Sequence, residues 1–285
     1  YKRQTIISVV NVTSGGASMA NAYWNGKLMA YGNGGSSFKP LAGSLDVAAH
    51  EMTHGVIAST ANLEYQGESG ALNESFADVF GSLVDRDDYK IGEDVVFTNS
   101  FPSGALRDIS DPHNGGSSLN DNGYQPRHMS EKYTGSQDNG GVHINSGIPN
   151  WAFYKYAIAV GRFRASKVFY RALTNYLTAS SQFIDLRIAV IQSAKDLYGS
   201  TSKESTQAAS AFQAVGITDG TTETYTSTLP TNPGTEYLLS YDTDDSNTDG
   251  LYRSPATATN FTALVTKTLG NKPSVTDDGS YAVFV

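Results

Sequence analysis

The stretch DVAAHEMTHGV, residues 46–56, constrains this chain more than any other segment. Its apolar residues recur at helical spacing, so we expect a largely buried helix. His50 and His54 stand four positions apart, and Glu51 directly follows the first histidine. Side chains four residues apart on a helix lie one above the other, so both imidazoles can reach the same point. The pattern predicts two zinc ligands, with Glu51 beside them as a general base.

The alternative is a buried helix whose histidines only form hydrogen bonds. A third ligand distinguishes the two readings, and the motif NESFAD, on a second predicted helix, supplies one. Glu74 is the predicted ligand, and Asp78, one turn later, is placed to accept the other ring N–H of His50. Two histidines and one glutamate leave a fourth position for water, which is typical of a catalytic zinc site rather than a structural one.

The periodicity of the chain changes several times. Residues 5–38 are rich in Gly, Ser, Asn, β-branched and aromatic residues, which indicates short strands joined by tight turns. Helical spacing begins at Leu45 and returns over residues 72–86, whereas residues 86–142 are dominated by loop-forming residues. Four more helices are predicted at about 146–160, 165–178, 183–198 and 202–214, with Gly199 and Gly216 at C-terminal stop positions.

The composition changes again near the C-terminus. Residues 218–234 are rich in Thr, Pro and Gly and are predicted to form a linker. Residues 235–285 alternate as strands do, and their tail resembles one unit of a TolB-type β-propeller repeat. One blade cannot close a propeller, so either the repeat continues beyond Val285 or the likeness is accidental. We therefore predict an α+β protein with a β-rich N-terminal lobe (1–44), the zinc-site helices and a helical lobe (45–217), the linker, and a β-rich appendage.

Charge and composition exclude other classes of protein. The formal net charge of -8 argues against nucleic-acid binding, which requires a basic face. No stretch approaches the roughly 20 apolar residues that cross a bilayer, so we expect no membrane partner. The chain has no Cys, so its composition does not indicate a redox compartment. Acidic residues cluster in DRDDYKIGED and YDTDDSNTDG, which suggests calcium sites.

Several motifs in order resemble thermolysin and its relatives, the gluzincin endopeptidases. The resemblance spans residues 8–217 and rests on NAYWNG, DVAAHEMTH, NESFAD, IGEDV, GALRDISDP and YTGSQDNGGVHINSGI. The metzincin family is excluded, because its pattern needs Gly and His where this chain has Ile57 and Thr60. The resemblance implies a thermolysin-like fold and a secreted, monomeric zinc endopeptidase that cleaves polypeptides.

The resemblance also implies roles for residues outside the two helices. Tyr65 and His143 match the pair that hydrogen-bonds the tetrahedral oxyanion, and Asp138 matches the carboxylate that orients His143. Considered alone, Tyr65 is an ordinary half-buried tyrosine, and DNGGVH is more often a surface turn. The remaining histidines, His113 and His128, receive no role.

Substrate binding is likewise implied by the family. Asn21 and the backbone of Ala22 match residues that bind an extended peptide as an added strand, and Arg107 matches the arginine that holds a peptide carbonyl. The walls of the pocket for the side chain after the scissile bond are matched by Phe38, Leu41, Val47, Ile91, Val95 and Leu106. An apolar pocket predicts cleavage before Leu, Phe, Ile or Val.

The acidic cluster near the zinc helices has a counterpart in the family. The residues that match structural calcium ligands are Asp46, Asp85, Asp88 and Glu93. Such carboxylates repel one another without a cation, although a solvated acidic loop is the alternative. Lys90 stands where thermolysin has a bridging glutamate, so we expect one calcium ion at this site.

Two expectations concern the rest of the protein. Family members carry a further β-rich block ahead of residue 1, so we expect a thinner cleft wall and an exposed sheet edge here. The alternative function is a binding protein that acts through its β-rich appendage and carries a catalytically weak or inactive zinc lobe.

Overall fold

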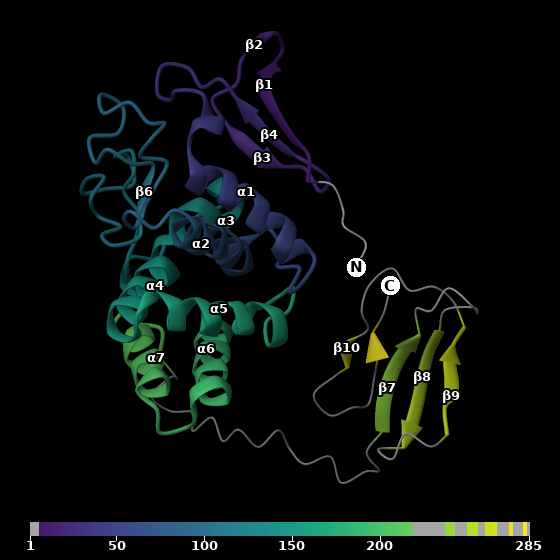
Figure 1. Ribbon diagram of the computed structural model, residues 1–285. Coiled ribbons are helices and arrows are strands. Elements are labelled where there is room, and N and C mark those ends of the chain that lie inside the picture. Colours follow the sequence, from purple (N-terminus) through teal and green to yellow (C-terminus); the bar gives the residue numbers. More distant parts are fainter. Residues whose placement is uncertain are drawn as a thin grey trace. The chain divides into compact units, whose positions relative to one another are not determined.

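The computed structural model describes residues 6–218 and, beyond them, 237–242, 250–255, 260–266, 274–275 and 282–283. The chain divides into two compact units, Tyr1–Thr218 and Asp219–Val285 (Figure 1). Helices and sheets are mixed, and the fold is α+β. Among the described residues, no helix is both long and apolar enough to cross a membrane.

The first unit begins with a four-stranded sheet of order β2-β1-β4-β3. Its strands are β1 (Ser8–Ser14), β2 (Ala17–Ser18), β3 (Ala22–Trp24) and β4 (Met29–Gly32). β4 is wholly buried and pairs in parallel with β1 and antiparallel with β3. β3 is an edge strand, so one of its sides is left unpaired toward the cavity described below. The predicted short strands are confirmed.

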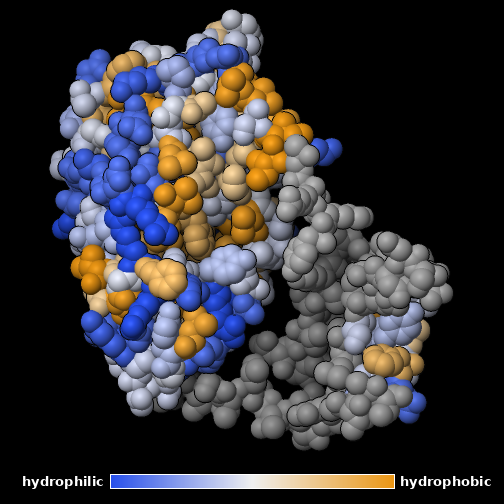
Figure 2. All heavy atoms as spheres, viewed as in Figure 1, coloured by the Kyte–Doolittle hydropathy of each residue, from blue (hydrophilic) through white to orange (hydrophobic). Residues whose placement is uncertain are grey.

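β1 carries apolar side chains that lie at the surface. Val9 and Val10 are exposed, and so are Ile6 and Ile7 just before the strand. In Figure 2, hydrophobic residues gather over the upper right part of the first unit, where Figure 1 places β1. A strand that is apolar on both faces is typical of the interior of a sheet, but β1 pairs with β2 only at Thr13 and Ser14, so its first residues pair on one side only, with β4.

Two helices follow the sheet, α1 (Leu45–Ala58) and α2 (Gly67–Val84). α2 begins five residues before the predicted start at residue 72, because GESGA precedes the apolar pattern but still takes helical geometry. Gly70 lies in this added turn, and a Cβ there would stand 2.4 Å from Cγ1 of Val142. The missing side chain therefore lets α2 approach the segment that carries His143.

Residues 85–136 are mostly loop, as predicted. They contain a two-stranded ladder of β5 (Lys90–Ile91) and β6 (Arg107–Asp108), an isolated bridge from Val96 to Phe38, and one short 3-10 helix, Met129–Glu131. The predicted loop was expected to extend to residue 142, but α3 is assigned over Gln137–Asn145. Its residues 138–141 have positive φ and form a left-handed turn, so right-handed helix begins at Val142.

The helical lobe consists of α4 (Gly147–Val160), α5 (Arg162–Asn175), α6 (Phe183–Tyr198) and α7 (Lys203–Gln213). These agree with the predicted ranges within three residues at each end. The main core joins this lobe to α2 through buried aromatic residues, among them Phe76, Phe153 and Phe169. Because α2 is anchored in this core, its inner face presents Glu74 from a rigid support.

The second unit contains β7 (Tyr237–Asp242), β8 (Gly250–Pro255) and β9 (Thr262–Val265), an antiparallel sheet of order β7-β8-β9. A short antiparallel pair joins β10 (Ser274–Val275) and β11 (Ala282–Val283). The predicted alternation of residues 235–285 is thus confirmed where it is described. The predicted linker, apart from Thr218, and most of the propeller-like tail lie outside the described residues.

Candidate metal centre

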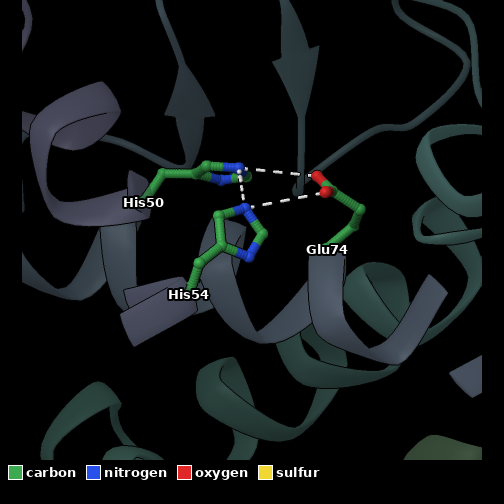
Figure 3. A group of neighbouring side chains, drawn as sticks. All are labelled: His50, His54 and Glu74. Atoms are coloured by element: carbon green, nitrogen blue, oxygen red, sulfur yellow. Dashed lines mark hydrogen bonds and ion pairs between the residues drawn. The ribbon is translucent and has the colours of Figure 1, made fainter. Parts of the chain in front are cut away.

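His50, His54 and Glu74 converge on one point between α1 and α2 (Figure 3). The two Nε2 atoms are 3.1 Å apart, Nε2 of His50 is 3.4 Å from Oε2 of Glu74, and Nε2 of His54 is 3.6 Å from Oε1. Ligands of a tetrahedral zinc ion, with bonds of about 2.0–2.2 Å, stand roughly 3.3–3.5 Å from one another. The three side chains therefore already have the spacing of a tetrahedral zinc site.

The environment of these ligands also fits a cation. Oε2 of Glu74 is buried and has no hydrogen-bond partner, which is costly for a carboxylate unless a cation binds it. Burial opposes ionisation of Glu74, but the adjacent charge of His50 holds its pKa well below the usual range. Glu74 is thus an anion whose oxygen faces two imidazoles, and a divalent metal ion fits this set.

Second partners fix the orientation of both imidazoles. Nδ1 of His50 is 2.9 Å from Oδ1 of Asp78, and Nδ1 of His54 is 2.8 Å from Oδ1 of Asn73. A proton held on Nδ1 leaves the Nε2 lone pair for a metal. Burial, followed by the charge of His50, lowers the pKa of His54 to about 4, so this imidazole is neutral at physiological pH. The sequence analysis named Asp78 but missed Asn73, which directly precedes Glu74.

Asp78 is the centre of a buried network. Arg107 donates from its Nη2 to Oδ1 at 2.6 Å and from Nε to Oδ2 at 2.8 Å, and Asn150 donates to Oδ2 at 2.9 Å. Burial raises the pKa of Asp78, but the charge of Arg107 and the bonds to His50 outweigh it and lower the pKa to about 2. Asp78 is therefore ionised and held by three elements. Asn150 was not foreseen, because α4 is distant in sequence.

Glu51 lies in the same cavity as the three candidate ligands and is only 6% exposed. Burial raises the pKa of its carboxyl group, and the neighbouring Glu74 raises it further, while His50 and the Trp24 backbone N–H act against them. A raised pKa makes a carboxylate a stronger base, which suits proton abstraction near neutral pH.

Tyr65, His143 and Asp138 form a chain at the cavity. The Tyr65 hydroxyl donates to Oε1 of Glu74 and lies 3.1 Å from Nε2 of His143. Asp138 accepts from the backbone N–H of His143 and lies 2.7 Å from its Nδ1. The left-handed turn over residues 138–141 makes this double contact possible, because it folds Asp138 back onto His143. A strained turn of this kind persists when a functional geometry requires it.

A cavity of about 680 Å³ holds these groups. All nine residues that the sequence analysis assigned to substrate binding line its wall. Ala20, Tyr23 and Trp24, which lie on or beside β3, also line the cavity but were not predicted. Alternation could have indicated Trp24 from Ala22, because every second residue of a strand points to the same side, but it could not have indicated the adjacent Tyr23 as well.

The acidic cluster lies apart from the cavity. Carboxylate oxygens of Asp85, Glu93 and Asp94 come within 4.8 Å of one another. Burial and the charges of Asp46, Asp88 and Asp85 raise the pKa of Glu93 to about 7, and its Oε2 is buried without a partner. Two of the four predicted calcium residues, Asp85 and Glu93, thus belong to this group together with Asp94, which was not predicted, whereas Asp46 and Asp88 are outside it.

The two histidines without a predicted role lie elsewhere in the first unit. His113 is 2.9 Å from Glu131 and stacks on Tyr124, and His128 accepts a hydrogen bond from the backbone of Ser130. Neither lines the cavity.

Comparison with known proteins agrees with this geometry. Residues 2–58 match the model of the thermolysin metallopeptidase catalytic domain, and residues 61–217 match that of its alpha-helical domain. The chain is 47% identical over 223 residues to neutral protease B of Bacillus subtilis, with 74% of this chain and 39% of the relative covered. It therefore spans about two fifths of that relative's length.

Two further proteins are similar. A neutral protease of Bacillus pumilus is 49% identical over 217 residues, covering 76% of this chain and 68% of the relative. In three dimensions, the precursor of protealysin, a metalloproteinase from Serratia proteamaculans, matches with a TM-score of 0.63 and 35% identity. That match covers 70% of this chain and 65% of the other.

Proposed function

This chain belongs to the thermolysin family of metallopeptidases, and we propose that it is a zinc-dependent endopeptidase that acts outside the cell as a monomer. One observation carries the enzymatic part of the proposal. Three side chains with the spacing of zinc ligands share a cavity with a buried carboxylate, Glu51, of raised pKa. Secretion and the monomeric state rest on the family resemblance.

His50, His54 and Glu74 would hold the zinc ion. When bound, zinc supplies a water of lowered pKa, about 7, and polarises the scissile carbonyl. Glu51 accepts a proton from the attacking water and passes it to the leaving amine. His143 and Tyr65 donate hydrogen bonds to the oxyanion that develops on the substrate, and Asp138 keeps the His143 ring in position.

The cavity wall supports a peptide substrate. The edge strand β3 can pair with an extended peptide through its unpaired side, near Asn21 and Ala22. Arg107, held by Asp78, is placed at the cavity wall to donate to a peptide carbonyl. Side chains such as Phe38, Val47 and Ile91 make the pocket apolar. We propose cleavage on the amino side of Leu, Phe, Ile or Val.

A structural calcium ion belongs to the proposal. Asp46, Asp85, Asp88 and Glu93 would bind it, and the unpartnered buried oxygen of Glu93 supports this assignment. Calcium prefers such sets of carboxylate oxygens. The positive charge of Lys90 in the same loop disfavours a second ion.

The alternative, a binding protein with an inactive zinc lobe, receives less support. The candidate ligands, the base and both oxyanion donors are all present in this chain and close together.

The test compares the wild type with Glu51→Gln on a mixed peptide pool, with cleavage sites mapped by mass spectrometry and metal content measured per chain. We expect Glu51→Gln to keep its zinc and to lose at least about 100-fold in rate, since general-base catalysis contributes that much. Glu64→Gln, at an exposed carboxylate before α2, is the matched control and should cleave normally. Equal rates of wild type and Glu51→Gln, with zinc bound in both, would refute the proposal.

A further inference from the structure

We propose that Gln125 is a positioning residue for His143, holding the backbone that carries this oxyanion donor. The inference rests on the proposed function, because it assigns a role in that reaction. Gln125 is only 3% exposed and lies on the loop before η2 (Met129–Glu131). It does not line the cavity and contacts none of the candidate zinc ligands.

The carboxamide of Gln125 donates two hydrogen bonds at the end of the turn that carries His143. Its Nε2 lies 2.6 Å from the His143 carbonyl oxygen and 2.9 Å from Oγ of Ser146. Ser146 in turn donates to the same carbonyl at 3.1 Å. Three polar groups thus form a closed cluster at the junction of α3 and α4.

These bonds complement those of Asp138. Asp138 binds the ring and the N–H of His143, so it fixes the residue from its amino-terminal side. Gln125 fixes the carbonyl on the other side of the same residue. The His143 side chain is 49% exposed, so packing alone restrains it weakly. Its position therefore depends on polar contacts at both ends.

Gln125 is itself held firmly. Its backbone N–H donates to the Pro112 carbonyl at 2.8 Å. On either side, Tyr124 stacks on His113 with ring centroids 4.8 Å apart, and Arg127 pairs with Asp111 at 3.1 Å. Two contacts between segments 111–113 and 124–127 thus lie on either side of Gln125. Through its stacking on Tyr124, His113 helps to hold the loop that carries Gln125.

The opposing helix is shaped for this contact. Gly147 starts α4, and a Cβ there would stand 2.4 Å from the Pro126 carbonyl oxygen and 2.6 Å from Cβ of Gln125. Any side chain at position 147 would push the loop away. Gly147 therefore permits the approach that brings the Gln125 amide to the His143 carbonyl.

Loss of the Gln125 hydrogen bonds should affect kcat but not KM or zinc content. An oxyanion donor acts through its exact placement in the transition state, so a loosened His143 lowers kcat more than substrate affinity. Gln125→Met keeps the side-chain length but lacks the amide N–H groups. We expect its kcat to fall roughly 10-fold, which is less than the ~100- to 1000-fold loss when an oxyanion donor itself is removed. KM and zinc content should stay as in the wild type.

The experiment measures kcat and KM of zinc-loaded full-length Gln125→Met, Gly147→Ala and the control Gln192→Met, whose amide contacts Asp196 on the surface of α6. Affinity for a phosphinic peptide, a tetrahedral mimic, should fall in parallel with kcat/KM in the first two variants only. Unchanged kcat in both variants would overturn the inference, and so would a loss of zinc that accounts for the fall.

A second readout does not depend on turnover. In the chelated protein, imidazole NMR signals of His143 should shift or broaden in Gln125→Met, while those of His54 stay unchanged. Unchanged His143 signals would overturn the inference. If wild-type protein with bound zinc cleaved no peptide, the proposed function would fail, and the NMR result would still decide whether Gln125 positions His143.

Discussion

Asn73 determines which nitrogen of His54 is available to a metal ion. Its Oδ1 accepts from Nδ1 of His54, and its Nδ2 donates to the Leu63 carbonyl at 3.1 Å, so the amide orientation is set from both sides. Asp78 has the same function for His50, with the additional effect of a negative charge. The two imidazoles are therefore oriented by chemically different partners, and each can be tested separately.

Asn73→Ala should weaken zinc binding about 10- to 100-fold, as is usual when a partner of a metal-bound histidine is lost. The neutral His54 ring would then lose its fixed orientation. Competition for zinc with a chromophoric chelator measures the effect. Asn120→Ala, in an exposed loop, serves as the control, and equal zinc affinity of the two variants would contradict the assigned role.

At the scale of elements, α2 is the helix that connects the zinc ligands, the segment carrying His143 and the acidic cluster. Glu74 and Asp78 project from it toward α1, Gly70 gives room to Val142, and its C-terminal end leads into the acidic cluster at Asp85. A displacement of α2 would therefore disturb the zinc ligands and the proposed calcium ligands together. The proposed calcium binding would therefore be coupled to the integrity of the proposed zinc site.

The raised pKa of Glu93 should make the stability of the protein depend on pH. Burial and the neighbouring carboxylates raise its pKa from 4.5 to about 7 in the folded, ion-free protein. The contribution of Glu93 to stability is thus complete below the unfolded value and is lost as pH rises through about 7. With calcium chelated, we expect a higher Tm at about pH 5.5 than at about pH 8.

Added calcium should reverse this order, because the ion binds the ionised carboxylate. Thermal unfolding with and without calcium measures it. Glu93→Gln should lose both the pH effect and most of the calcium effect, whereas Glu64→Gln should keep them. A calcium-induced rise in Tm of equal size in Glu93→Gln would show that Glu93 is not a ligand.

At the scale of the whole molecule, the residues of the proposed active site and the β-rich C-terminal appendage belong to different structural units. Every residue that lines the cavity lies between Ala20 and His143, within the first unit. Of the described residues in the second unit, none takes part in the cavity or in the two carboxylate-containing clusters. The first unit therefore contains all groups that the proposed reaction uses.

Removal of residues 219–285 should leave zinc content unchanged and kcat/KM for short peptides within roughly twofold, because all groups of the proposed reaction belong to the first unit and independent sites contribute additively. Peptide kinetics of the full and shortened chains provide the measurement. A loss of peptide cleavage with zinc still bound would contradict this prediction and show that the second unit contributes to catalysis.

Much of the site could be predicted because its chemistry is local in sequence. The spacing of His50 and His54, the position of Glu51 after the first histidine, and the four-residue step from Glu74 to Asp78 all follow from the geometry of single helices. The helices of the helical lobe were predicted well for the same reason, because long amphipathic periodicity is a local signal that does not depend on how the helices pack. The start of α2 was placed too late because Gly-rich residues 67–71 lack that periodicity.

What the sequence by itself determined is therefore the set of chemical groups on each helix face and the order of elements along the chain. Only the tertiary structure decided which distant groups meet: Asn150 with Asp78, and Gln125 with His143. These contacts depend on how helices and loops pack across long sequence separations, and no local period encodes that packing. The approach of His143 to Glu74 has the same origin, because it requires a left-handed turn over residues 138–141 and the missing side chain of Gly70.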